Sequence, residues 1–128
     1  DTFSRDPEKI HYGSNSGFQG INLAILFGAT KIILVGFDMR VNGKRHFFGD
    51  HPAGLLNSAD YTKWVPTFEY AAKRLTGVEI INATPGSAIT CFKMMDLHDA
   101  LSDPPSGERS NDVAAADRPG AYQDALQG

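Results

Sequence analysis

The apolar residues of the chain repeat with two different periods, and these periods predict alternating helices and strands. Between residues 17 and 27 the spacing is helical, with apolar side chains at Phe18, Ile21, Ala24, Ile25 and Phe27. Asn15 or Ser16 can cap the start of this helix, and Gly28 suits the left-handed position that ends it. A helix over 17–27 is therefore predicted.

Continuous apolar runs mark the strands. The run Ile32 to Val35 is too short for a helix and stops at Gly36, which is typical of a strand covered on both faces. The sequence VEIIN at 78–82 predicts the next strand, and KIHY at 9–12 resembles a short strand at the start of the chain.

Two further helices are expected. In the first, capped by Ser58 and ended by Gly77, Pro66 either begins a new helix or kinks the old one. Its apolar side contains Trp64, Phe68, Ala71, Ala72 and Leu75. The second covers 94–101 and is capped from Asp96.

The resulting order is strand, helix, strand, helix, strand, helix, which predicts an α/β domain with a parallel sheet over residues 1–101. Residues 38–58 are polar and contain VNG, so a loop or small hairpin is expected there. Residues 102–128 are rich in proline, glycine and charge, and we interpret them as a flexible tail or one that packs against a neighbouring chain as a homo-oligomer.

Composition narrows the function classes. The formal net charge of −3 comes from the tail, because residues 1–101 contain ten acidic and ten basic residues, so no basic face favours nucleic acid. A single cysteine, Cys91, excludes an internal disulfide framework, and no spacing of Cys and His predicts a metal site. The sequence contains no apolar run long enough to span a membrane and no leader peptide, so a cytoplasmic protein is expected.

Three polar turns follow the three predicted strands, at Ser14–Gly17, Asp38–Arg40 and Thr84–Ser87. Ligands of open parallel sheets bind beyond the carboxyl ends of the strands, so these turns should meet at one edge. The first turn precedes a helix, where N–H groups attract a phosphate or carboxylate. The alternative is that Asn15, Ser16 and Gly17 only cap the helix.

Other titratable residues have structural interpretations. His11 is expected at a strand end, His98 in solvent and Cys91 in the core, while Asp38 can bond neighbouring turn amides. The basic residues between Arg40 and His46 are either a solvated turn or a local anion patch.

The segments GSNSGFQGINLAILFGATKIILVGFD, NG and GVEIINATPGSAITCF resemble the C-terminal half of the bacterial lipooligosaccharide sialyltransferase family. The resemblance spans roughly residues 9–101 and extends to uncharacterised relatives, which include hydroxymethylpterin pyrophosphokinase-like and phage-encoded homologues. It implies a Rossmann-like, three-layer parallel sheet that is incomplete here, because the family's Gly-Asn-Gly nucleotide turn belongs to an N-terminal half.

The resemblance also implies residue roles. The family binds a sugar activated by cytidine monophosphate (CMP) without an essential metal or other cofactor, and its Thr-Ser-Gly nucleotide contact corresponds to Asn15, Ser16 and Gly17. Two tyrosines that stabilise the departing phosphate correspond to Arg40 and His46. The catalytic histidine that follows the family's lid corresponds to His51.

Three functions stay open at this point. The first is inverting sugar transfer from a nucleotide donor, with His51 as base and with Asp38 and Ser87 at the binding edge. The second is a non-catalytic phage or bacterial binding or assembly module that keeps the fold. The third, pyrophosphoryl transfer, would require magnesium, for which the sequence offers only Asp96 and Asp99.

Overall fold

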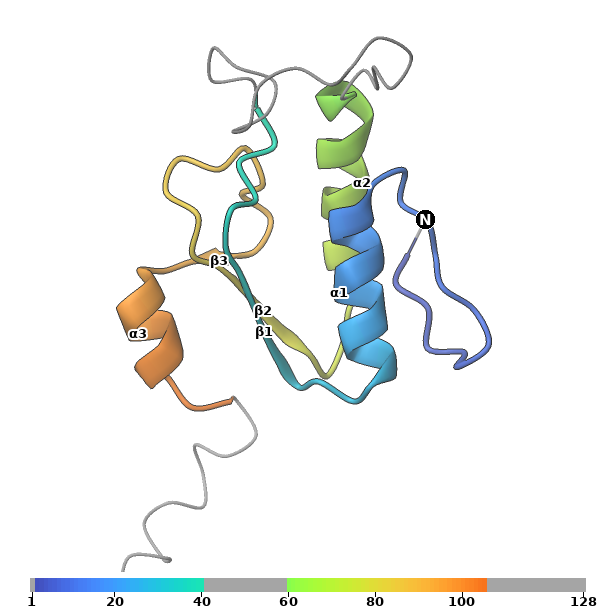
Figure 1. Ribbon diagram of the computed structural model, residues 1–128, viewed down its shortest axis with the longest axis horizontal. Coiled ribbons are helices and arrows are strands. Elements are labelled where there is room, and N and C mark those ends of the chain that lie inside the picture. The colour runs from blue at the N-terminus through green and yellow to red at the C-terminus, as the bar shows by residue number, and fades with distance from the viewer. Residues whose placement is uncertain (1, 41–59, 106–128) are drawn as a thin grey trace, which may run out of the picture.

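The computed structural model describes residues 2–40 and 60–105. In chain order the elements are α1 (Ser16–Leu26), β1 (Lys31–Leu34), α2 (Tyr61–Ala72), β2 (Glu79–Asn82), β3 (Lys93–Met94) and α3 (Leu97–Ser102). The strands pair in parallel in the order β1-β2-β3. Figure 1 shows α1 and α2 to one side of the strands and α3 to the other. The described residues thus form a partial α/β fold with the predicted parallel sheet.

Aromatic side chains join the two larger helices into one core. Phe18 of α1 and Phe68 of α2 are fully buried, and their ring centroids lie 5.5 Å apart. Phe3 stacks on Phe18 at 4.4 Å, and Phe92 meets Phe68 edge to face at 6.4 Å. Such ring pairs stabilise the core beyond the burial of their area alone. Four distant parts of the sequence are therefore held by one aromatic cluster.

The helical and strand periods place the predicted residues in this core. Ile21 and Ile25 of α1 are buried beside Phe18, and Leu34 of β1 and Ile80 of β2 are buried beneath them. The predicted helix over 17–27 and the strands at 32–35 and 78–82 are confirmed to within one or two residues.

The predicted strand at residues 9–12 is wrong. In the structure the N–H group of His11 donates to Oδ1 of the buried Asn22, at 3.0 Å, instead of to a neighbouring strand. The same Asn22 accepts from the N–H of Ser4 at 2.9 Å and donates to its carbonyl at 3.0 Å. One side chain of α1 thus replaces a strand as the partner of this segment.

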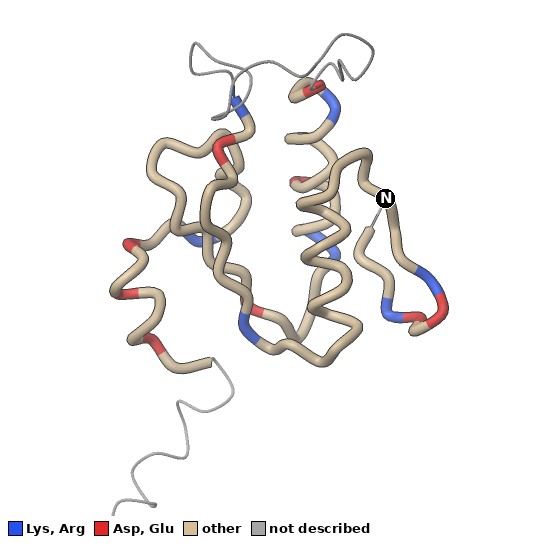
Figure 2. Tube along the Cα trace, viewed as in Figure 1, with Lys and Arg blue, Asp and Glu red and all other residues tan. Residues whose placement is uncertain are grey.

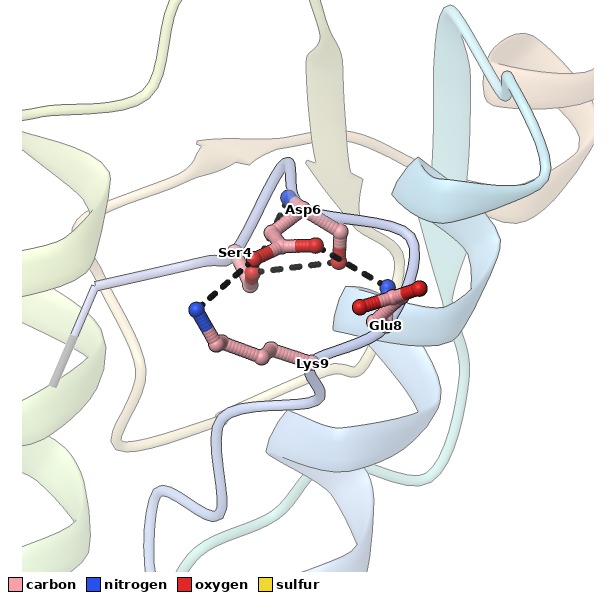
Figure 3. Close-up of polar contacts among 4 residues, drawn as sticks. All are labelled: Ser4, Asp6, Glu8 and Lys9. Atoms are coloured by element: carbon pink, nitrogen blue, oxygen red, sulfur yellow. Dashed lines mark hydrogen bonds and ion pairs between the residues drawn. The ribbon is translucent and has the colours of Figure 1, made fainter.

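A turn before this segment reverses the chain (Figure 3). The Asp6 carboxylate accepts from the N–H of Glu8 at 3.0 Å and forms an ion pair of 2.9 Å with Lys9. The bond from Lys9, followed by that from the Glu8 amide, lowers the pKa of Asp6. The turn is therefore a local polar unit, which an alternating apolar pattern does not reveal.

The second helix differs from its prediction at both ends. It begins at Tyr61 with Asp60 at the cap position, whereas the predicted cap, Ser58, lies outside the described residues. The helix continues through Pro66, and Lys73 is its C-terminal cap, ahead of the predicted stop at Gly77. Proline is tolerated here at the cost of one backbone bond early in the helix.

The short strand β3 was not predicted. Residues 94–101 were expected to be one helix, but Lys93–Met94 pairs with β2, and α3 begins only at Leu97. The predicted cap is confirmed, since Asp96 accepts from the N–H of His98 at 2.8 Å. Two residues are too few to produce a recognisable strand period.

Bonds from the sheet hold the end of α3, and they reach past residue 101 to Asp103. Lys31 at the start of β1 donates to the carbonyl oxygens of Ala100, at 2.6 Å, and of Asp103. Lys93 of β3 forms an ion pair with Asp103 at 3.5 Å. The remainder of the predicted tail, from residue 106, lies outside the described residues.

Replacing Asn22 by alanine tests its role in holding the N-terminal segment. The change leaves the N–H groups of Ser4 and His11 and the Ser4 carbonyl without their partner, which should lower the free energy of unfolding by about 1–3 kcal/mol. Urea denaturation of Asn22→Ala measures this loss. The exposed neighbour Leu23→Ala is the control and should change stability by less than about 0.5 kcal/mol. Equal effects of the two variants would contradict this role.

Candidate functional site

The turn before α1 and the turns that follow β1 and β2 meet at one edge of the sheet, as predicted. A Cβ atom on Gly17 would lie 2.8 Å from the ring of Phe37, which follows β1. The Arg40 guanidinium lies 3.7 Å from the corresponding position at Gly86, in the turn after β2. Residues separated by up to fifty positions are thus neighbours at the carboxyl edge, the name used below for these three turns.

The backbone of Phe37 connects the last two turns. Its N–H donates to Oγ1 of Thr84 at 2.9 Å, and its carbonyl accepts from Oγ of Ser87 at 2.5 Å. The N–H of Ala88 donates in addition to the carbonyl of Asp38 at 2.9 Å. Two side chains of the turn after β2 therefore replace a strand partner for the chain that leaves β1.

Asn82, the last residue of β2, shapes that turn. Its fully buried side chain accepts from the N–H of Thr84 at 3.0 Å and donates to the carbonyl of Ile89 at 2.9 Å. Asn82 was missed as a site-forming residue in the sequence. A polar residue that ends an apolar run just before a Pro-Gly turn was the available signal.

At the start of α1, Asn15 acts as the helix cap. Its Oδ1 accepts from the N–H of Phe18 at 2.8 Å, and its Nδ2 donates to the carbonyl of Gly13 at 2.9 Å. Within the described residues, the N–H groups of Ser16 and Gly17 have no hydrogen-bond partner. These two donors lie at the positive end of an eleven-residue helix.

The predicted binding residues separate into two groups by exposure. Ser16, Asp38 and Arg40 are exposed, so their polar groups face solvent at the carboxyl edge. Asn15 and Ser87 are buried, and the bonds given above engage their side chains in the fold. His46 and His51 lie outside the described residues.

Gly17 has a packing reason beyond any contact with a ligand. Any larger side chain would meet the Phe37 ring and also Oδ1 of Asn15, which would lie 3.2 Å from the new Cβ. The missing side chain therefore lets the start of α1 approach the chain beyond β1. This close approach brings the two unpartnered N–H groups to the same edge as Asp38 and Arg40.

The acidic residues needed for magnesium chemistry lie on α3. Acidic positions gather along this helix, on the other side of the sheet from α1 and α2 (Figures 1 and 2). Asp96 is occupied as its cap, and Asp99 lies 3.7 Å from the ring of His98. Over residues 2–40 and 60–105, no group of three or more His, Cys, Asp or Glu side chains could hold a metal ion.

A hollow of about 470 Å³ lies apart from these turns, beside the second half of α2. Its lining is formed by Glu69, Ala72, Lys73, Thr90 and Cys91. Burial, with a smaller contribution from the Glu69 charge, raises the pKa of the Cys91 thiol to about 11. A thiol that keeps its proton at neutral pH is a poor nucleophile, in agreement with the structural interpretation of Cys91.

No protein-family model, curated protein or solved structure matches the chain. Among the helices in the described part of the chain, none has the length and apolar character needed to cross a membrane.

The bonds to Phe37 can be tested by a double-mutant cycle. Thr84→Val removes the acceptor for its N–H, and Ser87→Ala removes the donor to its carbonyl. Each change should cost about 1–3 kcal/mol of unfolding free energy, because each leaves a part-buried backbone group without its partner. Since both bonds hold the same residue, chemical denaturation should give a double variant that loses less than the sum of the single losses. Strict additivity would contradict a shared role.

The protonation state of Cys91 has a kinetic consequence. Because only the thiolate reacts with iodoacetamide, the alkylation rate of the folded chain should rise about tenfold per pH unit until the pH approaches about 11. Alkylation kinetics over a pH series measure this dependence. The urea-unfolded chain is the control, and its alkylation rate should level off once the pH passes the ordinary thiol pKa of 9.0. A plateau near that value in the folded chain would contradict the raised pKa.

Proposed function

We propose that the carboxyl edge binds the phosphate of a nucleotide, and that the chain is a sialyltransferase-like glycosyltransferase domain with a Rossmann-like arrangement. The supporting observation is the convergence at one edge of two unpartnered helix N–H groups, at Ser16 and Gly17, with an exposed guanidinium, that of Arg40. Both kinds of group favour a phosphate over a neutral ligand.

The chemistry of the edge suits a nucleotide better than a bare phosphate. A phosphate accepts from the Ser16 and Gly17 N–H groups and from Arg40, whereas the exposed carboxylate of Asp38 accepts from hydroxyl or amino groups. A ligand that has an anion at one end and such donors at the other complements both signs of charge. The resemblance to a family that uses CMP-activated sugars names such a ligand.

In the proposed transfer, a base removes the proton of the acceptor hydroxyl while its oxygen attacks the anomeric carbon of the sugar from the face opposite the phosphate. The bond to the phosphate breaks, and CMP leaves with the electron pair. Arg40, with His46 by resemblance, stabilises the negative charge on the departing phosphate. The resemblance assigns the base to His51.

Calorimetric titration of the full chain with CMP tests the proposal. Arg40→Ala should weaken CMP binding by about 1–3 kcal/mol, because it removes a charge-assisted hydrogen bond. Arg74→Ala is the matched control, since that guanidinium stacks 3.6 Å from the Tyr70 ring centroid and donates to the Tyr70 carbonyl. It should leave affinity unchanged.

Cytidine, which lacks the phosphate, should bind much more weakly than CMP. Equal affinity for CMP and cytidine, or an unchanged affinity in Arg40→Ala, would contradict the phosphate site. Binding of CMP without release of CMP from a CMP-activated sugar, tested with a panel of acceptor sugars, would favour the non-catalytic binding module.

A further inference from the structure

Met39 has a backbone conformation that a residue with a side chain does not favour. Its φ angle is +49°, in the left-handed region, where the Cβ atom of an L-residue lies too close to the carbonyl oxygen that follows. Glycines occupy other left-handed positions of the carboxyl edge or beside it, at Gly36 and Gly86, with φ angles of +76° and +67°. Over residues 2–40 and 60–105, Ser14 and Met39 are the non-glycine residues with such an angle. The contacts of the Met39 side chain must therefore offset its backbone strain.

The chain is held immediately before, at and after Met39. The carbonyl of Asp38 accepts from the N–H of Ala88 at 2.9 Å, which fixes the chain to the turn after β2. The Met39 side chain is partly buried and packs against the hydrophobic core. The Arg40 guanidinium lies 3.7 Å from the position of a Cβ atom on Gly86. A backbone bond, a core contact and the exposed cation of the edge thus belong to three consecutive residues.

We propose that Met39 is a positioning residue for the phosphate site of the carboxyl edge, an inference that rests on the proposed function. Its side chain, packed against the core, holds the backbone in the left-handed conformation, and this conformation directs Arg40 over the turn that contains Gly86. An extended or right-handed residue 39 would send the chain in another direction after Asp38, so the guanidinium would leave this turn. Met39 acts only through Arg40, because its thioether has no hydrogen-bond donor for an anion.

Order at Arg40 favours binding of an anion. A long side chain that is mobile before binding loses rotamer freedom when the ligand arrives, and this loss lowers the affinity. A glycine at position 39 would relieve the backbone strain, but it would also lack the core contact and allow several directions of the chain. The strain at Met39 therefore accompanies a guanidinium that is already in place.

Calorimetric titration of matched variants of the full chain with CMP tests this role. Met39→Ala keeps the left-handed strain and removes the core contact, so it should raise the CMP dissociation constant about fivefold, the effect of ordering one long side chain on binding. Met39→Leu keeps an apolar contact and should retain most of the affinity. Leu75→Ala is the control, because it removes another partly buried side chain that packs against the same core, beyond the end of α2. It should lower stability and leave CMP affinity unchanged.

A double variant shows whether Met39 acts through Arg40. In the Arg40→Ala chain, adding Met39→Ala should cause no further loss of CMP affinity, because the positioned group is already absent. Full additivity of the two losses would overturn the inference, and so would equal losses in Met39→Ala and Met39→Leu.

The amide resonance of Gly86 reports the position of Arg40 without any ligand. Arg40→Ala and Met39→Ala should shift this resonance in the same direction, since each removes the guanidinium from the turn, whereas Leu75→Ala should leave it in place. A resonance that responds to Arg40→Ala but not to Met39→Ala would overturn the inference. If the unchanged chain binds no CMP while the Gly86 shifts are as expected, the proposed function fails and the positioning of Arg40 by Met39 is supported.

Discussion

The two hydrogen bonds that hold the backbone of Phe37 determine how the carboxyl edge is assembled. After Leu34 the chain leaves the sheet and loses β2 as a partner, yet Thr84 and Ser87 bond the part-buried N–H and C=O groups of Phe37. This positions the Phe37 ring against Gly17, so the start of α1 is placed by the same contact. Unsatisfied backbone groups at this depth would cost more than the bonds contribute.

Buried polar side chains supply hydrogen bonds to backbone groups in this fold, as additional strands would in a larger sheet. Asn22 pairs with the N-terminal segment, Asn82 organises the turn after β2, and Asn15 caps α1. Each amide offers donors and an acceptor on one short side chain, so it can bond two backbone groups that point in different directions. The exposed groups at the carboxyl edge, Ser16 and Arg40 among them, are thereby left for solvent or a ligand.

The sequence predicted the parts of the fold that have a strong period. The helix at 17–27 and the strands at 32–35 and 78–82 were predictable because their apolar spacing reflects burial. The predicted strand at 9–12 was wrong because the N–H of His11 donates to the side chain of Asn22, eleven residues away, instead of to a strand. The strand β3 is too short to have a recognisable period. The meeting of the three turns followed from topology, whereas the engagement of Ser87 within the fold depends on a contact fifty residues away.

Hydrogen exchange at the Phe37 amide tests the central claim most directly. If Thr84 holds this N–H as part of a fixed edge, the amide should exchange as slowly as those of β2 in the core, such as Ile81, and only through large-scale unfolding. Exchange of the Phe37 amide at the rate of an unprotected turn, while Ile81 stays protected, would contradict the account, because the edge would then open independently of the sheet.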